Sequence, residues 1–334
     1  MAFSSLPVDV LDVLCQFIAE SDLPAVARVN SRICPSAQRY LYRSLAFTSP
    51  AKAARCFKTL RRNPLLHRHV RELSLRADPY APLLRSLVDL LGAVLADAQN
   101  LISLELVLPQ CATNVFLAAE KKDTLYARLV NFSCNLPFNS ALCSFLQRTP
   151  SVKALQLSDY SSAYSDLPDL PISALPSLRA FTGSSDLATL LAPGRPLESV
   201  HLFSGELSQT IIDALSRSSS SIAIFGAFTT SLSPSILHCL AENLPHLHHL
   251  RIMTMYHTFN QPDESFYTQV VQILSTLPEL VTAELAGFRW APWKDPKGTT
   301  VVDRIKAKHA SDAATEPEPE NSHQTISDFD IGMY

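Results

Sequence analysis

Four histidines form the densest cluster of side chains in this sequence that could bind a metal ion. They are His246, His248, His249 and His257. A zinc site needs three or four ligands held at fixed geometry, and its ligands usually stand at characteristic short spacings. Nothing near the cluster supplies further ligands at such a spacing. We therefore expect these histidines to lie exposed around a strand, and we predict no metal site.

Motifs for nucleophilic or phosphate chemistry are absent from the sequence. It contains no P-loop, no G-x-G-x-x-G, no G-x-S-x-G and no H-E-x-x-H. The chain contains only 8 glycines, whereas phosphate-binding loops are rich in glycine. We predict no catalytic residues and no cofactor, and hence a protein that is not an enzyme. A hydrolase without a recognisable motif, built on a repeat fold, stays open as an alternative hypothesis.

Cysteine usage and charge indicate the compartment and exclude some partners. The 7 cysteines are dispersed without a C-x-x-C pair, which is typical of reduced, mostly buried thiols. No run of 18 apolar residues is free of charge, and Asp9 and Asp12 stand where a signal peptide would need cations. We expect a protein of the cytoplasm, the nucleus or both, without a membrane. The formal net charge of −3 gives no reason to expect nucleic acid as a partner.

The first 47 residues predict three short amphipathic helices. The apolar residues of the first recur at helical spacing: Val10, Leu11, Leu14 and Ile18. A second helix is predicted to begin at Asp22 as N-cap, and a third runs from about residue 31 to 41. So small a unit cannot bury all of its apolar stripes. We expect another part of the chain, or another polypeptide, to cover the remainder.

This segment resembles an F-box over residues 4 to 47. The matching elements are Leu6-Pro7, Asp9-Val10-Leu11, Ile18, Asp22-Leu23, Val26, Val29-Asn30, Arg32 and Leu41-Tyr42-Arg43-Ser44-Leu45. In that family the module docks a Skp-type adaptor, which joins it to a cullin scaffold in a ubiquitin ligase. The resemblance implies adaptor contacts at Leu6, Pro7, Val10, Leu11, Leu14, Ile18, Leu23 and Val26. The alternative is an ordinary helical cap on the domain that follows.

A second pattern, a short apolar strand of the form L-x-x-L-x-L, recurs from residue 70 to 285. Its middle residues are Leu73, Leu104, Phe132, Leu155, Phe181, Val200, Phe225, Leu250 and Ala283. They lie about 26 residues apart on average, within the ~20–29 residues typical of leucine-rich repeats. The chain thus also resembles leucine-rich-repeat proteins over residues 70 to 290.

Amphipathic segments between these strands predict helices. One is expected over residues 263–277 with Asp263 as its N-cap, and another opens at Ser233-Pro234. Strands and helices that alternate at this short period predict parallel strands with right-handed returns, stacked as a solenoid. We therefore predict an α/β fold in which a three-helix F-box precedes an irregular leucine-rich-repeat-like solenoid with parallel strands and outer helices. The alternative is a conventional α/β sheet domain.

We divide the chain into four parts. These are an F-box-like helical module (1–47), a basic helical linker (48–69), the repeat solenoid (70–294) and a disordered acidic tail (295–334). The tail contains Glu316-Pro-Glu-Pro-Glu and lacks apolar periodicity. Residues 39–76 hold ten Lys and Arg against Glu72 alone. We interpret them as a solvated helix face, or else as a patch for the acidic tail, a phosphorylated substrate or nucleic acid.

Two other segments have open interpretations. The polar, proline-rich residues 158–173 form either a solvated connection or a recognition loop. Residues 287–294 carry both tryptophans, Trp290 and Trp293, which either cap the last repeat or anchor a substrate.

The function that these patterns favour is substrate recognition in an SCF-type E3 ubiquitin ligase. The F-box would dock the Skp-type adaptor, and the repeats would bind an unknown target protein. Candidate target contacts are exposed strand positions and one aromatic residue: Arg251, Met253, Met255 and Trp290. The alternative is a leucine-rich-repeat scaffold for protein interactions that does not assemble into a ligase.

Overall fold

The computed structural model describes residues 6–158, 168–230, 232–254, 264–285 and 288–290. Its central element is a sheet of eleven strands, hydrogen-bonded in the order in which they occur in the chain. They are β1 (Ser44–Phe47), β2 (Glu72–Arg76), β3 (Ser103–Val107), β4 (Asn131–Cys134), β5 (Ala154–Leu157), β6 (Ala180–Ser184), β7 (Ser199–Ser204), β8 (Ile224–Thr229), β9 (His249–Thr254), β10 (Thr282–Leu285) and β11 (Phe288–Trp290). Strands β1 to β10 are parallel, and β11 is antiparallel to β10.

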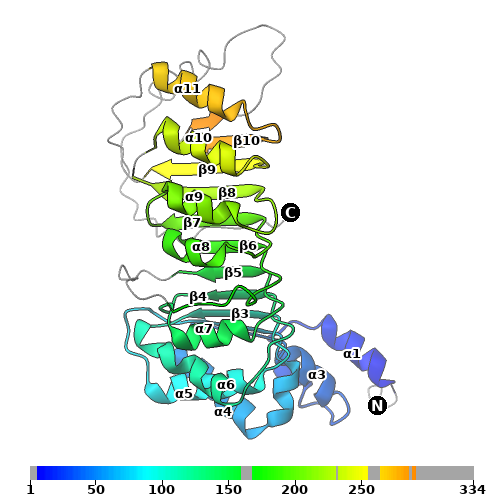
Figure 1. Cartoon of the computed structure of the whole chain (residues 1–334). Helices are drawn as coiled ribbons and strands as arrows, with labels where there is room; N and C mark the ends of the chain where they lie inside the picture. Colours follow the sequence, from blue (N-terminus) through cyan, green and yellow to red (C-terminus); the bar gives the residue numbers. More distant parts are fainter. Residues whose placement is uncertain (1–5, 159–167, 231, 255–263, 286–287, 291–334) are drawn as a thin grey trace, which may run out of the picture.

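Helices occupy most of the connections between strands, as Figure 1 shows. Three precede the sheet: α1 (Val8–Gln16), α2 (Leu23–Val26) and α3 (Cys34–Leu41). The others are α4 (Pro50–Arg62), η1 (Pro64–His69), α5 (Arg85–Asp97), η2 (Gln110–Phe116), α6 (Leu117–Lys121), α7 (Ser140–Gln147), α8 (Ser185–Leu191), α9 (Gln209–Ser216), α10 (Pro234–Asn243) and α11 (Glu264–Leu274). The predicted α/β fold with parallel strands and intervening helices is confirmed. The strictly sequential strand order differs from a doubly wound sheet, whose order reverses at a switch point.

The repeat positions read from the sequence are register partners in the sheet. Leu73 lies opposite Leu104, and Leu104 lies opposite Phe132. The same column continues through the remaining strands to Leu250 and Ala283. Each of the nine predicted middle residues is at most 2% exposed. Since side chains alternate across a strand, this column and the one two residues later face the helices and form one continuous core.

The first unit of the sheet begins earlier than the predicted boundaries. Strand β1 lies inside the range 1–47 that we assigned to the helical module, and it pairs with β2 through Leu45 and Leu73. Helix α4 lies inside the predicted linker 48–69. Its Phe57 and Leu60 side chains are fully buried in the main core, because they face the sheet. Residues 44–69 therefore form a strand and helix of the repeat array.

The three N-terminal helices have a small core of their own. Its buried members are Leu11, Cys15, Leu23, Ile33 and Ala37. In Figure 1 these helices project from the end of the array that holds the first strands. The second predicted helix is present as α2, which is only 4 residues long. Helix α10 follows the prediction, since Ser233 is its N-cap and accepts a hydrogen bond from Ile236 N.

Several predictions fall on residues outside the described part of the chain. These are the acidic tail 295–334, Trp293, His257, Met255, Asp263 and residues 159–167 of the proposed insertion. Within the ranges that the structure does describe, no helix is both long and apolar enough to cross a bilayer.

Candidate functional site

Helix α1 carries an uncovered apolar face. Its side chains Val8, Val10, Val13, Leu14 and Phe17 are between 38% and 82% exposed, with Phe17 at the C-cap the most exposed. Val10, Val13, Leu14 and Phe17 stand at helical positions i, i+3, i+4 and i+7, which places them along one side of the helix. Val8 lies two residues before Val10 and so faces another side. The opposite side carries Leu11 and Cys15, which point into the small core. The exposed side is therefore a continuous apolar surface that no described part of the chain covers.

The eight predicted adaptor contacts divide into three groups. Leu11 and Leu23 are buried in the small core, at 0% and 2% exposure. Leu6, Ile18 and Val26 pack partly against that core. Pro7, Val10 and Leu14 are exposed. Only the last group is freely available to a partner, whereas Leu11 and Leu23 stabilise the module itself.

Sequence reasoning missed Val13 and Phe17 as members of this surface. They stand three and seven residues after Val10, on the same side as Leu14, so the signal was present. The sequence alone does not determine how the helix is rotated about its axis. Apolar residues occur on two adjacent sides of the helix, and either side could face inward.

Polar contacts hold the module around α1. The Arg39 guanidinium on α3 forms an ion pair with the Asp12 carboxylate on α1. Arg32 Nη2 donates a hydrogen bond to the carbonyl oxygen of Leu6, at 3.2 Å. Both contacts tie the start of the chain to the third-helix region, and so fix the direction in which the exposed side of α1 faces.

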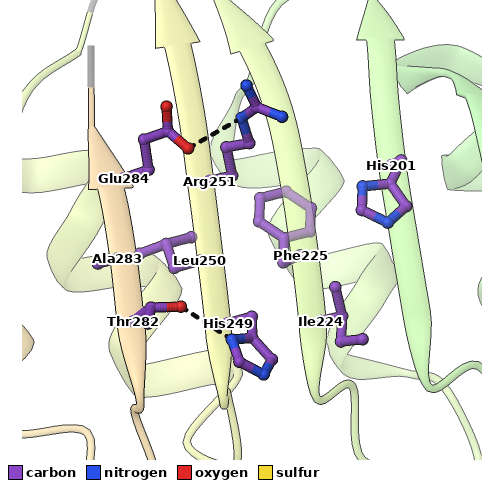
Figure 2. Close-up of a pocket in the computed structure, with 9 residues that line it drawn as sticks. All are labelled: His201, Ile224, Phe225, His249, Leu250, Arg251, Thr282, Ala283 and Glu284. Carbon is purple, nitrogen blue, oxygen red and sulfur yellow. Dashed lines mark hydrogen bonds and ion pairs between the residues drawn. The ribbon is translucent and has the colours of Figure 1, made fainter. Parts of the chain in front are cut away.

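The second candidate surface is a hollow on the exposed face of the sheet, between β7 and β10. Figure 2 shows the residues that line it. They are His201, Ile224, Phe225, His249, Leu250, Arg251, Thr282, Ala283 and Glu284. Its volume of about 200 Å³ is below the ~300–1,000 Å³ of sites for small molecules. It has room for a side chain of a polypeptide rather than for a cofactor.

Two polar pairs frame this hollow. Arg251 Nε lies 3.2 Å from Glu284 Oε2 on the neighbouring strand, and His249 Nδ1 lies 2.8 Å from Thr282 Oγ1. The register places Arg251 opposite Glu284 and His249 opposite Thr282, so both pairs cross from β9 to β10. The Arg251–Glu284 charges offset each other, which leaves the hollow without a strong net charge.

His201 forms the third side of the hollow and lies over Gly226. A Cβ atom at residue 226 would lie 2.7 Å from His201 Nδ1, so the ring occupies space that a side chain on β8 would fill. Burial by the surrounding residues and the positive charge of Arg251 lower the pKa of His201. The ring is therefore neutral at pH 7, where it can stack and accept or donate one hydrogen bond.

The four predicted target contacts have different positions. Arg251 lines the hollow, as expected for a contact residue. Met253 lies on the same strand and is partly buried, opposite Phe228. The backbone of Trp290 pairs with Ala283 in the antiparallel strand β11, while its side chain lies outside the described part of the structure, as does Met255.

Two histidines of the cluster form hydrogen bonds with one glutamate. His246 Nδ1 and His248 Nε2 each lie 3.1 Å from one carboxylate oxygen of Glu279. These hydrogen bonds, the one with His246 first, lower the pKa of Glu279. Among the residues that the structure describes, no group of three or more His, Cys, Asp or Glu is arranged to hold a metal ion.

Two further groups resemble reactive sites and serve structure instead. Burial raises the pKa of the Cys56 and Cys143 thiols to about 11, so both remain protonated near neutral pH and are poor nucleophiles. Arg195 is 1% exposed, but all three guanidinium nitrogens donate to carbonyl oxygens, those of Ala174, Leu190, Leu191 and Pro171, at 2.9–3.2 Å. This arginine fastens a loop to helix α8 and is not available to an anion.

No protein-family model matches the chain, and no curated protein matches its sequence.

Proposed function

We propose that this chain is the substrate-recognition subunit of an SCF-type E3 ubiquitin ligase. In this function the N-terminal helices dock a Skp-type adaptor, which joins the chain to a cullin scaffold. The parallel sheet and its helices serve as a leucine-rich-repeat-like solenoid that binds the target protein. The observation that supports this function most is the apolar side of α1, formed by Val10, Val13, Leu14 and Phe17.

Exposing an apolar patch of this kind to water is energetically unfavourable for a protein that acts alone. Apolar side chains that gather on one exposed surface mark a site for another polypeptide. The patch lies on the first helix of the segment that resembles an F-box, where that family contacts its adaptor. Residue type, exposure and position in the chain thus agree.

The proposed function needs no reactive group in this chain. A receptor that holds a target lysine near a charged conjugating enzyme raises the local concentration of the two reactants. The buried thiols and the glutamate-bound histidines described above are compatible with this mode of action. On the target side, the hollow beside His201 and Arg251 fits one side chain of a bound polypeptide segment.

Co-purification with a Skp-type adaptor tests the proposal. We expect the wild-type chain to retain the adaptor, and the variant Val13→Glu with Phe17→Glu to lose it, because two carboxylates would be placed in an apolar interface. Both residues are more than 50% exposed, so the variant should fold as the wild type does. Ser31→Glu is the matched control, since it adds a carboxylate at an exposed position of the module outside α1.

Equal recovery of the adaptor with the double variant, or no recovery with the wild type, would contradict the receptor function. The second of these results would favour the alternative scaffold function, in which the N-terminal helices only cap the repeat array. Leu11→Asp and Leu23→Asp are unsuitable for this test, because both side chains are buried and their replacement would unfold the module.

A further inference from the structure

A row of basic residues crosses the edge of the sheet at which the strands begin. Backbone hydrogen bonds continue there one residue before each strand. Arg71 N donates to Arg43 O at 2.9 Å, Ile102 N to Arg71 O at 2.7 Å, Val130 N to Ile102 O at 2.8 Å, and Lys153 N to Val130 O at 2.8 Å. Arg43, Arg71 and Lys153 thus stand in one row, together with Ile102 and Val130, and Arg128 lies two residues before Val130 along the chain, outside the row. We name these four residues the basic rim.

Three cations of the basic rim, Arg71, Arg128 and Arg43, lie close enough to influence one another. Arg71 is only partly exposed, and its Nη1 donates to the carbonyl oxygen of Asn100 at 3.1 Å. Burial first, and then the charges of Arg128 and Arg43, lower the pKa of Arg71. Within the described part of the chain, none of the four rim residues forms an ion pair. The carboxylate of the adjacent Glu72 accepts a hydrogen bond from Ser44 Oγ instead.

Elsewhere in the sheet, arginines are paired across neighbouring strands. Arg76 lies 2.7 Å from Glu105, and Arg179 lies 2.9 Å from Glu198. Arg76 ends β2, and Arg179 follows Lys153 in the same row, since Arg179 N donates to Lys153 O. The array therefore pairs these two arginines with carboxylates, whereas none of the four rim residues has such a pair in the described part of the chain. Arg43 and Arg128 repel Arg71, and unpaired cations at one edge would be stabilised by a ligand with several negative charges.

We propose that the acidic segment Glu316-Pro-Glu-Pro-Glu of this same chain binds the basic rim. Its carboxylates, from Glu316, Glu318 and Glu320, stand at alternate positions of the sequence. Alternate residues of an extended segment are ~6.6–7 Å apart and neighbouring strands ~4.8 Å. Arg71 and Lys153 stand three strand steps apart, ~14 Å, which is close to the ~13–14 Å between Glu316 and Glu320 in an extended segment. A segment that crosses the strand starts can therefore bring its two end carboxylates to these two basic residues.

The length of the chain permits this contact. Strand β11 ends at Trp290, and Glu316 is 26 residues further along. A fully extended chain of that length spans ~86–94 Å. The nine strand steps from β11 back to β2 amount to ~43 Å. The segment can therefore reach the rim, and its tether gives it an effective concentration of the order of millimolar at the site.

Charge complementarity also distinguishes the rim from the other basic surface. Helix α4 exposes Lys52, Arg55, Lys58, Arg61 and Arg62 to solvent. Arg61 and Arg62 stand in its last turn, where they interact favourably with the helix dipole. Arg61 and Arg62 thus have a local role, and so does Arg71 through its bond to Asn100, whereas no polar side-chain partner is seen for Arg43, Arg128 or Lys153 in the described structure.

Carbodiimide cross-linking of the full chain, followed by mass spectrometry, tests the proposal. This reagent joins an amine directly to a carboxylate in contact with it. We expect Lys153 to be joined to Glu316, Glu318 or Glu320, and the yield to fall about fivefold in 0.5 M salt, since salt screens exposed charges. The variant Arg43→Gln with Arg128→Gln should lower the yield similarly. Lys52 and Lys58 on α4 are internal controls.

A mixture of isotopically light and heavy chains shows whether the contact is within one molecule. Cross-links that join light to heavy chains would overturn the proposal in favour of contact between copies. So would equal cross-linking of the α4 lysines, or no cross-link at Lys153. A second measurement is the acetylation rate of Lys153, which should rise in the variant Glu316→Gln, Glu318→Gln, Glu320→Gln while that of Lys58 stays constant. An unchanged rate would also overturn the proposal. Neither measurement involves the adaptor.

Discussion

His67 is a titratable side chain enclosed by the structure. Only 4% of the residue is exposed, and neither ring nitrogen makes a hydrogen bond of normal geometry. Its Nδ1 lies 3.5 Å from the Asp97 carboxylate, which is itself paired with Lys122. Burial lowers the pKa of His67, and this effect outweighs the attraction of Asp97. The folded chain therefore holds the ring neutral.

The stability of the protein should fall as the pH drops below the ordinary histidine pKa of ~6.5. There the unfolded chain binds a proton at residue 67 and the folded chain does not, so protons favour unfolding. Between pH 7.5 and 5.5 the wild type should lose more free energy of unfolding than His67→Leu, by at most ~1.4 kcal/mol for each pH unit below 6.5. Urea denaturation at both pH values measures this difference.

The control is His238→Gln, a substitution of a histidine whose side chain is 65% exposed on α10. Comparison with this variant separates the effect of the buried ring from that of removing an exposed histidine. If His67→Leu lost as much stability as the wild type over the same interval, the buried ring would not be the group that titrates.

At the scale of elements, the strands were the part that the sequence predicted best. A strand that must place one face against a core repeats an apolar pair at a fixed offset, and Leu73, Leu104 and Phe132 therefore align in the sheet. The first strand escaped prediction although Leu45 stands 28 residues before Leu73, within the repeat spacing. The reason is that residues 41–45 also complete the F-box-like pattern. We assigned them to that pattern and so did not count Leu45 as part of a repeat strand.

The candidate site was less predictable than the strands. Helix α1 has apolar residues on two sides, and only packing against α3 decides that Leu11 is buried and Val13 exposed. The hollow near Arg251 depends on Gly226 and His201, which lie on different strands. Their relation arises from the register, so no local pattern in the chain reveals it.

Helix α10 offers a test of local capping within an array. The Ser233 hydroxyl oxygen accepts a hydrogen bond from Ile236 N, whereas Ser208, which has the same N-cap position on α9, makes no such bond. Replacing a capping serine by alanine costs ~1 kcal/mol. Ser233→Ala should therefore lower the free energy of unfolding by about that amount, and Ser208→Ala by clearly less. Chemical denaturation compares the two, and equal losses would contradict the role of the cap.

At the scale of the molecule, the described chain contains two separate cores. The large one runs through the sheet from Leu45 to Leu285 together with the outer helices. The small one has five fully buried residues, in and around α1 to α3. Helix α3 contacts η1, and Tyr42 packs against the large core, so the connection between the two is narrow. So small a core supplies little stability of its own.

This division predicts that the N-terminal module can unfold while the array remains folded. Leu11→Ala removes most of a fully buried side chain, a change that costs ~2–5 kcal/mol in well-packed cores. That loss is comparable with all that the small core can contribute, so the module should open locally. Hydrogen exchange should show faster exchange of the amides in α1 and α3, while those of β4 to β9 keep their protection. Val13→Ala, at an exposed position of the same helix, should change neither. Loss of protection in the central strands of Leu11→Ala would mean that the two cores unfold as one, and that the module is an integral cap of the array.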